Sequence, residues 1–282
     1  MKAFDLIDSG RKRLLQSPEV TRRGDERDQA AQMLERAIGL VPDDDDEVPA
    51  AAVRRYERLL DRRASGEPLA YILGYIEFRH LRLGVRPGAF IPRGTSEFLA
   101  ESAIRRTRGR RDPIAIDLAT GVGPVALSVA EAVPGAEVHG TDLAREAVLQ
   151  ARRNARELAL DNASFHCGDL FAPLPRRLRG GTNVMTVHPP YVPRHEVKLL
   201  PAEIRRFEPV DSLTDRSPDG LGLVSRVVAE SGEWLTSGGW LLMEVHPSDT
   251  RVISRMLRDE GFGDVRSVKG PLKWTRVVTA RA

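Results

Sequence analysis

The chain has 282 residues, a length that suits one large domain or two smaller ones. Hydrophobic residues make up 41% and charged residues 29%, which excludes a disordered chain. A net charge of +3 and only 5% aromatic residues argue against a large nucleic-acid interface. No run approaches the ~20 apolar residues of a membrane span, and the first residues lack a signal-peptide core. The single cysteine, Cys167, excludes an intramolecular disulfide framework, so we predict a cytoplasmic protein.

The N-terminal part of the sequence is typical of helices. Residues 1–70 carry apolar positions at helical spacing between charged residues, and they predict a helical N-terminal domain. The pattern changes after Gly66. Residues 71–78 and 81–85 alternate and are rich in β-branched and aromatic side chains, so 71–96 is expected to form a β-hairpin and a linker.

Residues 97–282 alternate short apolar runs with amphipathic stretches, which predicts an α/β domain with a mostly parallel sheet covered on both faces. The predicted strands cover residues 114–118, 137–141, 164–167, 184–187 and 240–245, with a terminal pair at 265–268 and 276–280. The predicted helices cover residues 124–132, 144–158 and 221–235. In such sheets a ligand binds at the carboxyl ends of the strands.

A glycine-rich segment follows the first predicted strand of this domain. It reads Asp117-Leu-Ala-Thr-Gly-Val-Gly123, and its two glycines allow a sharp turn and a close approach to a ligand. The helix that follows would direct its amide-rich N-terminus into the cleft. A Gly-x-Gly pair alone is weak support, because many tight turns use one.

Two further acids strengthen the case for a binding site. Asp142 closes the second strand, where a carboxylate can accept both hydroxyls of a ribose. Asp169 closes the third strand beside apolar residues that could flank a planar base. Together with Asp117, these residues place an acid at the end of each of three successive strands. It is a poor explanation that all three are ordinary exposed surface residues.

The fourth strand is followed by His188-Pro189-Pro190-Tyr191. The two prolines fix φ and have no N–H, so their carbonyl groups can be presented to a ligand. Tyr191 adds a flat face for an acceptor or for a charged sulfonium. The six histidines and the cysteine show no metal-ligand spacing, so we predict no metal site.

Taken together, these motifs resemble the release-factor glutamine methyltransferases, the HemK/PrmC family of class I S-adenosylmethionine enzymes. The matching segments occur in the family's order from Gly66 onward. They read GEPLAYILGYIEF, IPRGTSE, DLATGVG, GTD, CGDLF, HPPYVP, RRFEP, PDGL and LTSGGWLLMEV. The resemblance implies a Rossmann-like, seven-stranded methyltransferase domain that uses S-adenosylmethionine, and an N-terminal domain that recognises the substrate.

The resemblance also implies roles for individual residues. The segment from Asp117 to Gly123 would hold the methionine end of the cofactor, Asp142 the ribose hydroxyls, and Asp169 with Leu170 the adenine. The full set of predicted cofactor-binding residues is Asp117, Leu118, Ala119, Thr120, Gly121, Gly123, Asp142, Leu143, Asp169, Leu170, Arg93 and Glu97. The predicted catalytic residues are His188, Pro189, Tyr191 and Glu208.

Two departures from the family pattern matter. The family's acceptor motif is Asn-Pro-Pro-Tyr, in which the Asn oxygen and the first proline carbonyl accept the glutamine amide N–H groups, and here His188 replaces the Asn. Residues 92–97 read PRGTSE where the family usually reads PRPETE, although Glu97 is kept. A neutral imidazole offers one acceptor, but it can also take a proton near neutral pH.

These departures lead to competing functional predictions. We expect a small-molecule acceptor, such as a nitrogen heterocycle or amine of natural-product biosynthesis, with His188 as base or orienting group. The alternative is N5-methylation of a release-factor glutamine, with His188 as a hydrogen-bond partner. Less favoured are a nucleic-acid amino-group methyltransferase and an inactive binding module. The sequence leaves the oligomeric state open.

Overall fold

The computed structural model describes residues 1–21, 24–272 and 276–282. The chain divides into two compact units. The first comprises residues 1–75 and 198–208, and the second comprises residues 76–197 and 209–282. This division differs from the expected one in two respects: residues 76–96 of the expected hairpin and linker belong to the second unit, and a segment distant in sequence joins the N-terminal helices.

The first unit is helical. Its helices are α1 (Ala3–Gln16), α2 (Glu26–Ile38), α3 (Ala50–Ala64), α4 (Leu69–Leu73) and α8 (Ala202–Phe207). Apolar side chains at helical spacing, among them Leu6, Met33 and Leu60, form its core. A buried ion pair of 3.1 Å between Arg63 and Glu203 joins segment 198–208 to α3.

The second unit contains a two-stranded hairpin and a seven-stranded sheet. The hairpin strands are β1 (Tyr75–Phe78) and β2 (Leu81–Gly84). The sheet strands are β3 (Ile114–Leu118), β4 (Glu137–Asp142), β5 (Ala163–Cys167), β6 (Thr182–Val187), β7 (Leu235–Glu244), β8 (Gly263–Lys269) and β9 (Arg276–Arg281). Residues 71–73, expected in the hairpin, lie in α4 instead, because Gly74 adopts the left-handed conformation that ends a helix before β1 begins.

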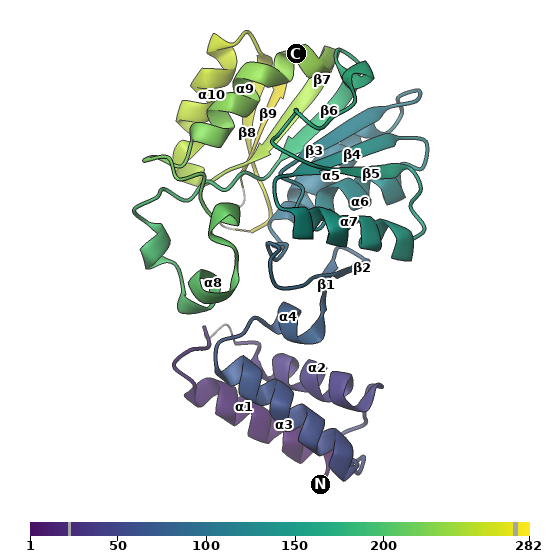
Figure 1. The fold of residues 1–282 in the computed structure, drawn as a ribbon, viewed down its shortest axis with the longest axis vertical. Helices are drawn as coiled ribbons and strands as arrows, with labels where there is room; N and C mark the ends of the chain where they lie inside the picture. The colour runs from purple at the N-terminus through teal and green to yellow at the C-terminus, as the bar shows by residue number, and fades with distance from the viewer. Residues whose placement is uncertain (22–23, 273–275) are drawn as a thin grey trace. The chain divides into compact units, whose positions relative to one another are not determined.

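The strand order is β5-β4-β3-β6-β7-β9-β8. Within this sheet as described, β9 pairs antiparallel with both β7 and β8, and the other neighbouring strands pair in parallel. The helices of this unit are α5 (Ser96–Thr107), α6 (Pro124–Ala132), α7 (Arg145–Glu157), α9 (Gly222–Trp234) and α10 (Thr250–Asp259). Figure 1 shows α5, α6 and α7 on one face of the sheet and α9 and α10 on the other.

Alternation along the strands creates the two cores of this unit. Ala115 and Val184 pack with the helices of one face, whereas their neighbours Ile116 and Met185 pack with the helices of the other. Because both faces are covered, the central strands are mostly buried, and the polar residues within them, such as Asp117 and Thr186, are buried as well. The predicted seven-stranded α/β fold with a helical N-terminal region is therefore confirmed. Among the described residues, no helix is both long enough and apolar enough to cross a membrane.

We predict that Gly140→Ala destabilises the second unit. Gly140 pairs with Asp117 in the parallel register, and an added Cβ would lie 2.6 Å from the Phe165 ring and 2.9 Å from the Thr120 methyl group. Such overpacking costs about 1–3 kcal/mol, which urea unfolding would measure. The control is Gly135→Ala, since a Cβ at Gly135 meets no atom within 4 Å. Equal stability of the two variants would contradict the prediction.

Candidate active site

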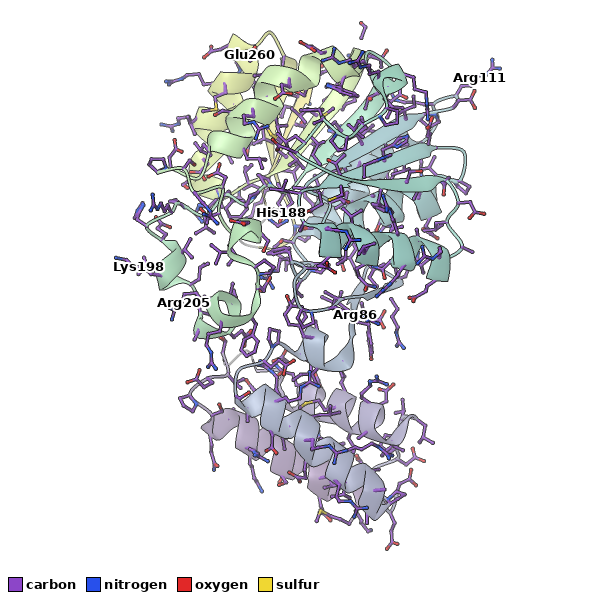
Figure 2. The ribbon with its side chains drawn as sticks, viewed as in Figure 1. Arg86, Arg111, His188, Lys198, Arg205 and Glu260 are labelled. Carbon is purple, nitrogen blue, oxygen red and sulfur yellow. The ribbon has the colours of Figure 1, made fainter. Side chains whose placement is uncertain are left out.

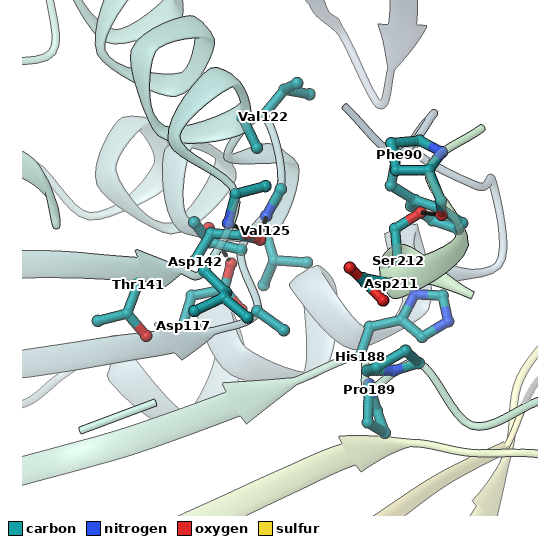
Figure 3. A pocket seen from close by; sticks show the side chains of 18 of the residues that line it. Phe90, Asp117, Val122, Val125, Thr141, Asp142, His188, Pro189, Asp211 and Ser212 are labelled. Atoms are coloured by element: carbon teal, nitrogen blue, oxygen red, sulfur yellow. Dashed lines mark hydrogen bonds between the residues drawn. The ribbon is translucent and has the colours of Figure 1, made fainter. Parts of the chain in front are cut away.

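A cavity of about 310 Å³ lies at the carboxyl ends of the central strands of the second unit (Figure 3). Its walls come from the segments that follow β3, β4, β5 and β6, because parallel strands end at the same edge of the sheet. The predicted site residues that line it are Asp117, Ala119, Thr120, Gly121, Asp142, Leu143, Asp169, Leu170, His188 and Pro189. The structure thus brings most of the predicted set together.

The loop after β3 turns sharply. Ala119 and Gly121 both have positive φ angles, 52° and 58°. The Thr120 amide donates to the Thr141 carbonyl of β4 (2.9 Å), which ties the loop to the neighbouring strand. Pro124 then occupies the first turn of α6, where its missing N–H costs nothing. The loop backbone is therefore held open against the cavity.

Asp117 is a buried acid at the floor of this loop. The Thr120 and Thr186 hydroxyls each donate a hydrogen bond of 2.6 Å to its carboxylate. Burial raises the pKa of Asp117 to about 6, against the lowering effect of these hydrogen bonds. A carboxylate held this way is poised to interact with a cationic ligand group.

Asp142 ends β4 and faces the same loop. One carboxylate oxygen accepts the Gly121 amide and the other accepts the Ala144 amide, both at 2.8 Å. Burial raises the pKa of this carboxyl above its usual range. Each oxygen accepts one of these bonds and has lone-pair capacity for another donor, so the pair can receive the two hydroxyls of a ribose.

Asp169 lines the cavity, but its carboxylate is already engaged. The Arg226 guanidinium donates to both of its oxygens, at 3.2 and 2.7 Å. The pair lies at the surface, where each side chain is 50% exposed. The adjacent Leu170 is buried, with a φ of 44°, and adds an apolar wall suited to a planar base.

The far end of the cavity is formed by the segment after β6. His188 is 16% exposed at its side chain, and its Nδ1 lies 3.0 Å from the Ser96 hydroxyl. Its ring is stacked on Tyr191, with centroids 5.6 Å apart, and meets the edge of Phe90. Figure 2 shows His188 among other side chains, whereas Arg111 and Glu260 extend outward.

Several predicted cofactor residues do not line the cavity. Leu118 follows Asp117 on β3, so its side chain points to the opposite face of the sheet, where it is fully buried in the core under α9 and α10. Gly123 immediately precedes α6 with a φ of 87°, and an added Cβ there would lie 3.0 Å from the Phe165 ring, so this position favours glycine for its conformation and its tight packing. Both residues shape the loop from outside the cavity.

Arg93 and Glu97 are also placed elsewhere. The Glu97 carboxylate accepts the Arg79 amide at 2.7 Å and so fixes the turn of the β1–β2 hairpin. The Arg93 guanidinium lies over the Phe90 ring, 4.6 Å from its centroid. Their predicted contact with the cofactor is therefore not supported by the geometry.

Two predicted catalytic residues are not part of the wall either. Tyr191 supports His188 by stacking, and its backbone bridges to Thr214. Glu208 is buried and ends α8 in the first unit. Neither residue lines the cavity.

The sequence reading missed several wall residues. Phe90 comes from the segment before α5 and Ser96 is the first residue of that helix. Asp211 and Ser212 precede α9, and Leu223 lies within it. The RRFEP motif at residues 205–209 lies just before Asp211 and Ser212, and it was a sequence feature that could have pointed to this segment.

The cavity suits S-adenosylmethionine. Each oxygen of the Asp142 carboxylate can accept one more hydrogen bond, which suits the two hydroxyls of a ribose. The side chains of Leu143 and Leu170 are apolar and suit the adenine, and the buried carboxyl of Asp117 suits the positively charged methionine end of the cofactor. The open turn at Gly121, where an added Cβ would meet no atom within 4 Å, leaves room for close backbone approach. The residues present therefore fit the cofactor that the resemblance implies.

We predict that Asp117 makes the cofactor-free protein less stable as the pH rises. With a pKa of about 6 in the folded state and near 4 when unfolded, Asp117 holds its proton longer when folded. The contribution of Asp117 to stability is therefore largest below about pH 4 and is lost between about pH 4 and pH 6. Asp117→Asn should remove this contribution. Between about pH 4.5 and pH 7.5, the free energy of unfolding of the natural chain should therefore fall by roughly 2 kcal/mol relative to that of the variant, as measured by urea unfolding.

The control for this experiment is Asp112→Asn, which changes an exposed aspartate just before β3. It should leave the pH dependence of unfolding as it is in the natural chain. An unaltered slope in Asp117→Asn would contradict the assignment of the buried proton to Asp117.

Comparison with known proteins assigns both parts of the chain. Residues 6–74 match the family model of the PrmC N-terminal domain, and residues 111–246 match that of a methyltransferase domain. The chain is 36% identical to the release factor glutamine methyltransferase of Burkholderia pseudomallei over 246 residues, covering 83% of this chain and 85% of the relative. It is 39% identical to that of Vibrio cholerae over 212 residues, covering 74% and 71%.

Solved structures support the fold. A 16S rRNA N2 G1207 methyltransferase from T. thermophilus aligns with a TM-score of 0.55 at 20% identity, over 73% of this chain and 49% of that one. At this identity the likeness concerns the fold alone.

The relatives correct one prediction. A small-molecule acceptor in natural-product biosynthesis, with His188 as its base, is wrong, because the similar curated proteins are named for a release-factor glutamine and the chain carries their N-terminal domain. The replacement of Asn by His188 was given too much weight against the rest of the chain. The cavity, the two domain matches and these relatives lead to one conclusion: the chain is an S-adenosylmethionine-dependent methyltransferase and belongs to the release factor glutamine methyltransferase family.

Proposed function

We propose that the protein transfers a methyl group to the side-chain amide nitrogen of a glutamine in a peptide-chain release factor. The observation that carries this proposal is the 36% identity, over most of both chains, to a protein named for that activity. We further propose that the first unit recognises the protein substrate, since residues 6–74 match the PrmC N-terminal domain. A cytoplasmic location accords with the free, exposed thiol of Cys167.

The acceptor end of the cavity supports an amide substrate. Neither Pro189 nor Pro190 has an N–H, so this backbone can only accept hydrogen bonds. The Pro190 carbonyl already accepts the Asp215 amide at 3.1 Å. The Pro189 carbonyl has no hydrogen-bond donor in the described part of the chain, and it is therefore our candidate acceptor for one N–H of the glutamine amide.

His188 is the candidate acceptor for the second N–H. An amide nitrogen is a weak nucleophile because its lone pair is delocalised, so orientation is the main help that a protein can give it. Two fixed acceptors would hold both N–H groups and direct the nitrogen toward the cofactor. When bound, S-adenosylmethionine supplies an electrophilic methyl group on a sulfonium sulfur. The amide nitrogen would form a bond to that methyl group as the methyl–sulfur bond breaks, which would leave a neutral thioether, and one N–H proton would pass to solvent.

We predict methylation of one glutamine in a purified release factor. With labelled S-adenosylmethionine, the intact factor should gain a single methyl group, which peptide mass spectrometry locates on a glutamine. The control is the same factor with that glutamine replaced by alanine, which should take up no label. Failure to label any release factor would contradict the proposal.

A second prediction concerns His188. His188→Ala removes one amide acceptor and should lower kcat/KM for the release factor by about tenfold to hundredfold. His188→Asn should retain most activity, because an amide oxygen is also an acceptor. The matched control is His195→Ala, which changes an exposed histidine of the same loop and should leave kcat/KM unchanged. Full activity of His188→Ala would rule out this role.

A further inference from the structure

Glu244 ends β7, next to the strand that leads to His188. Its side chain is 5% exposed, and its Oε2 atom is buried with no hydrogen-bond partner in the part of the chain that the structure describes. The nearest ring nitrogen is His188 Nδ1, at 3.6 Å. A buried carboxylate oxygen without a donor is costly, so this placement calls for an explanation.

The same ring nitrogen also meets Ser96. The Ser96 hydroxyl, in the first turn of α5, lies 3.0 Å from His188 Nδ1. The ring plane is fixed as well, because Tyr191 stacks on it with an interplanar angle of 25° and Phe90 meets it at 88°. One ring nitrogen of His188 therefore lies near two polar groups, and the ring packs against two aromatic side chains.

The chemistry of these partners decides which nitrogen carries the proton. A carboxylate only accepts hydrogen bonds, whereas a hydroxyl can donate or accept. A proton on Nδ1 is favoured by the Glu244 charge and can be shared with the Ser96 oxygen. A bare lone pair on Nδ1 would instead face a buried negative charge. The electrostatic influence of Glu244 on this cluster is also seen at Tyr191, whose pKa is raised to about 12 by burial and then by Glu244.

We propose that Glu244, aided by Ser96, is a positioning residue that holds His188 as the Nδ1–H tautomer and so leaves Nε2 as a hydrogen-bond acceptor in the cavity. This inference rests on the proposed function, because the acceptor is meant for an amide N–H of the substrate glutamine. In the opposite tautomer, the Nε2–H of His188 would face the N–H of the glutamine amide. Both groups are donors, so they would repel each other and form no hydrogen bond. On this view a histidine can stand where relatives use an asparagine only because its proton is directed away from the substrate.

The tautomer can be measured directly. In protein labelled with 15N-histidine, the ring nitrogens of His188 are assigned by the signal that is lost in His188→Asn. At neutral pH, and with no release factor present, the natural chain should show a protonated Nδ1 and a bare Nε2. A protonated Nε2 would overturn the proposal whatever the activity of the enzyme.

The test variant is Glu244→Gln, which keeps the shape of the side chain but can donate to Nδ1. It should raise the share of the Nε2–H tautomer and lower kcat for the release factor by about tenfold to hundredfold. Binding of S-adenosylmethionine, measured by calorimetry, should stay within about threefold, because Glu244 does not line the cavity. A merely structural role would instead change cofactor binding and thermal unfolding while leaving the tautomer as it was.

Two further variants sharpen the result. Ser96→Ala should keep the Nδ1–H tautomer, since Glu244 remains, and a switch to Nε2–H would overturn the assignment to Glu244. Glu131→Gln is the matched control: this glutamate also pairs with a histidine, His80, at 3.2 Å and outside the cavity, and the change should alter neither readout. If the natural chain methylates no release factor, the proposed function fails, and the NMR result still decides the tautomer.

Discussion

The parallel register of β3, β4 and β6 is the constraint on which the site depends. It sets Asp117 beside Gly140 on one side and beside Thr186 on the other, so the strand ends meet at one edge. The hydrogen bond from Gly121 to Asp142 then joins the loop after β3 to the end of β4. Since all of these contacts are made by the chain's own residues, the protein itself fixes the shape of this end of the cavity.

The two ends of the cavity use different chemistry. The end that we expect to hold the cofactor carries buried carboxylates, and burial raises the pKa of both Asp117 and Asp142. The acceptor end relies on a proline backbone and a clamped imidazole, which we propose to act as hydrogen-bond acceptors. Such a division suits a reaction between a cationic donor and a neutral amide, where positioning is the main contribution of the protein.

The residues around His188 suggest how the protein accommodates a histidine in place of the asparagine of the family's motif. A histidine in place of asparagine suggested a different acceptor when it was considered alone. In the folded protein its ring packs against two aromatic side chains and lies near a buried carboxylate, and we propose that the carboxylate selects which ring nitrogen carries the proton. The identity of a residue therefore gives its chemical options, and its neighbours select among them.

The sequence by itself determined the fold class and pointed to the residues at the strand ends, because alternation, glycine turns and acids after strands are local patterns. The cofactor followed from the resemblance of its motifs to a known family. The sequence did not determine that Glu97 fixes a hairpin turn, that Arg226 pairs with Asp169, or that residues 198–208 join the N-terminal helices. It also gave no sign that Glu244, at the end of β7, would lie 3.6 Å from His188. Those facts depend on which strands become neighbours in space, and only the tertiary structure decides that.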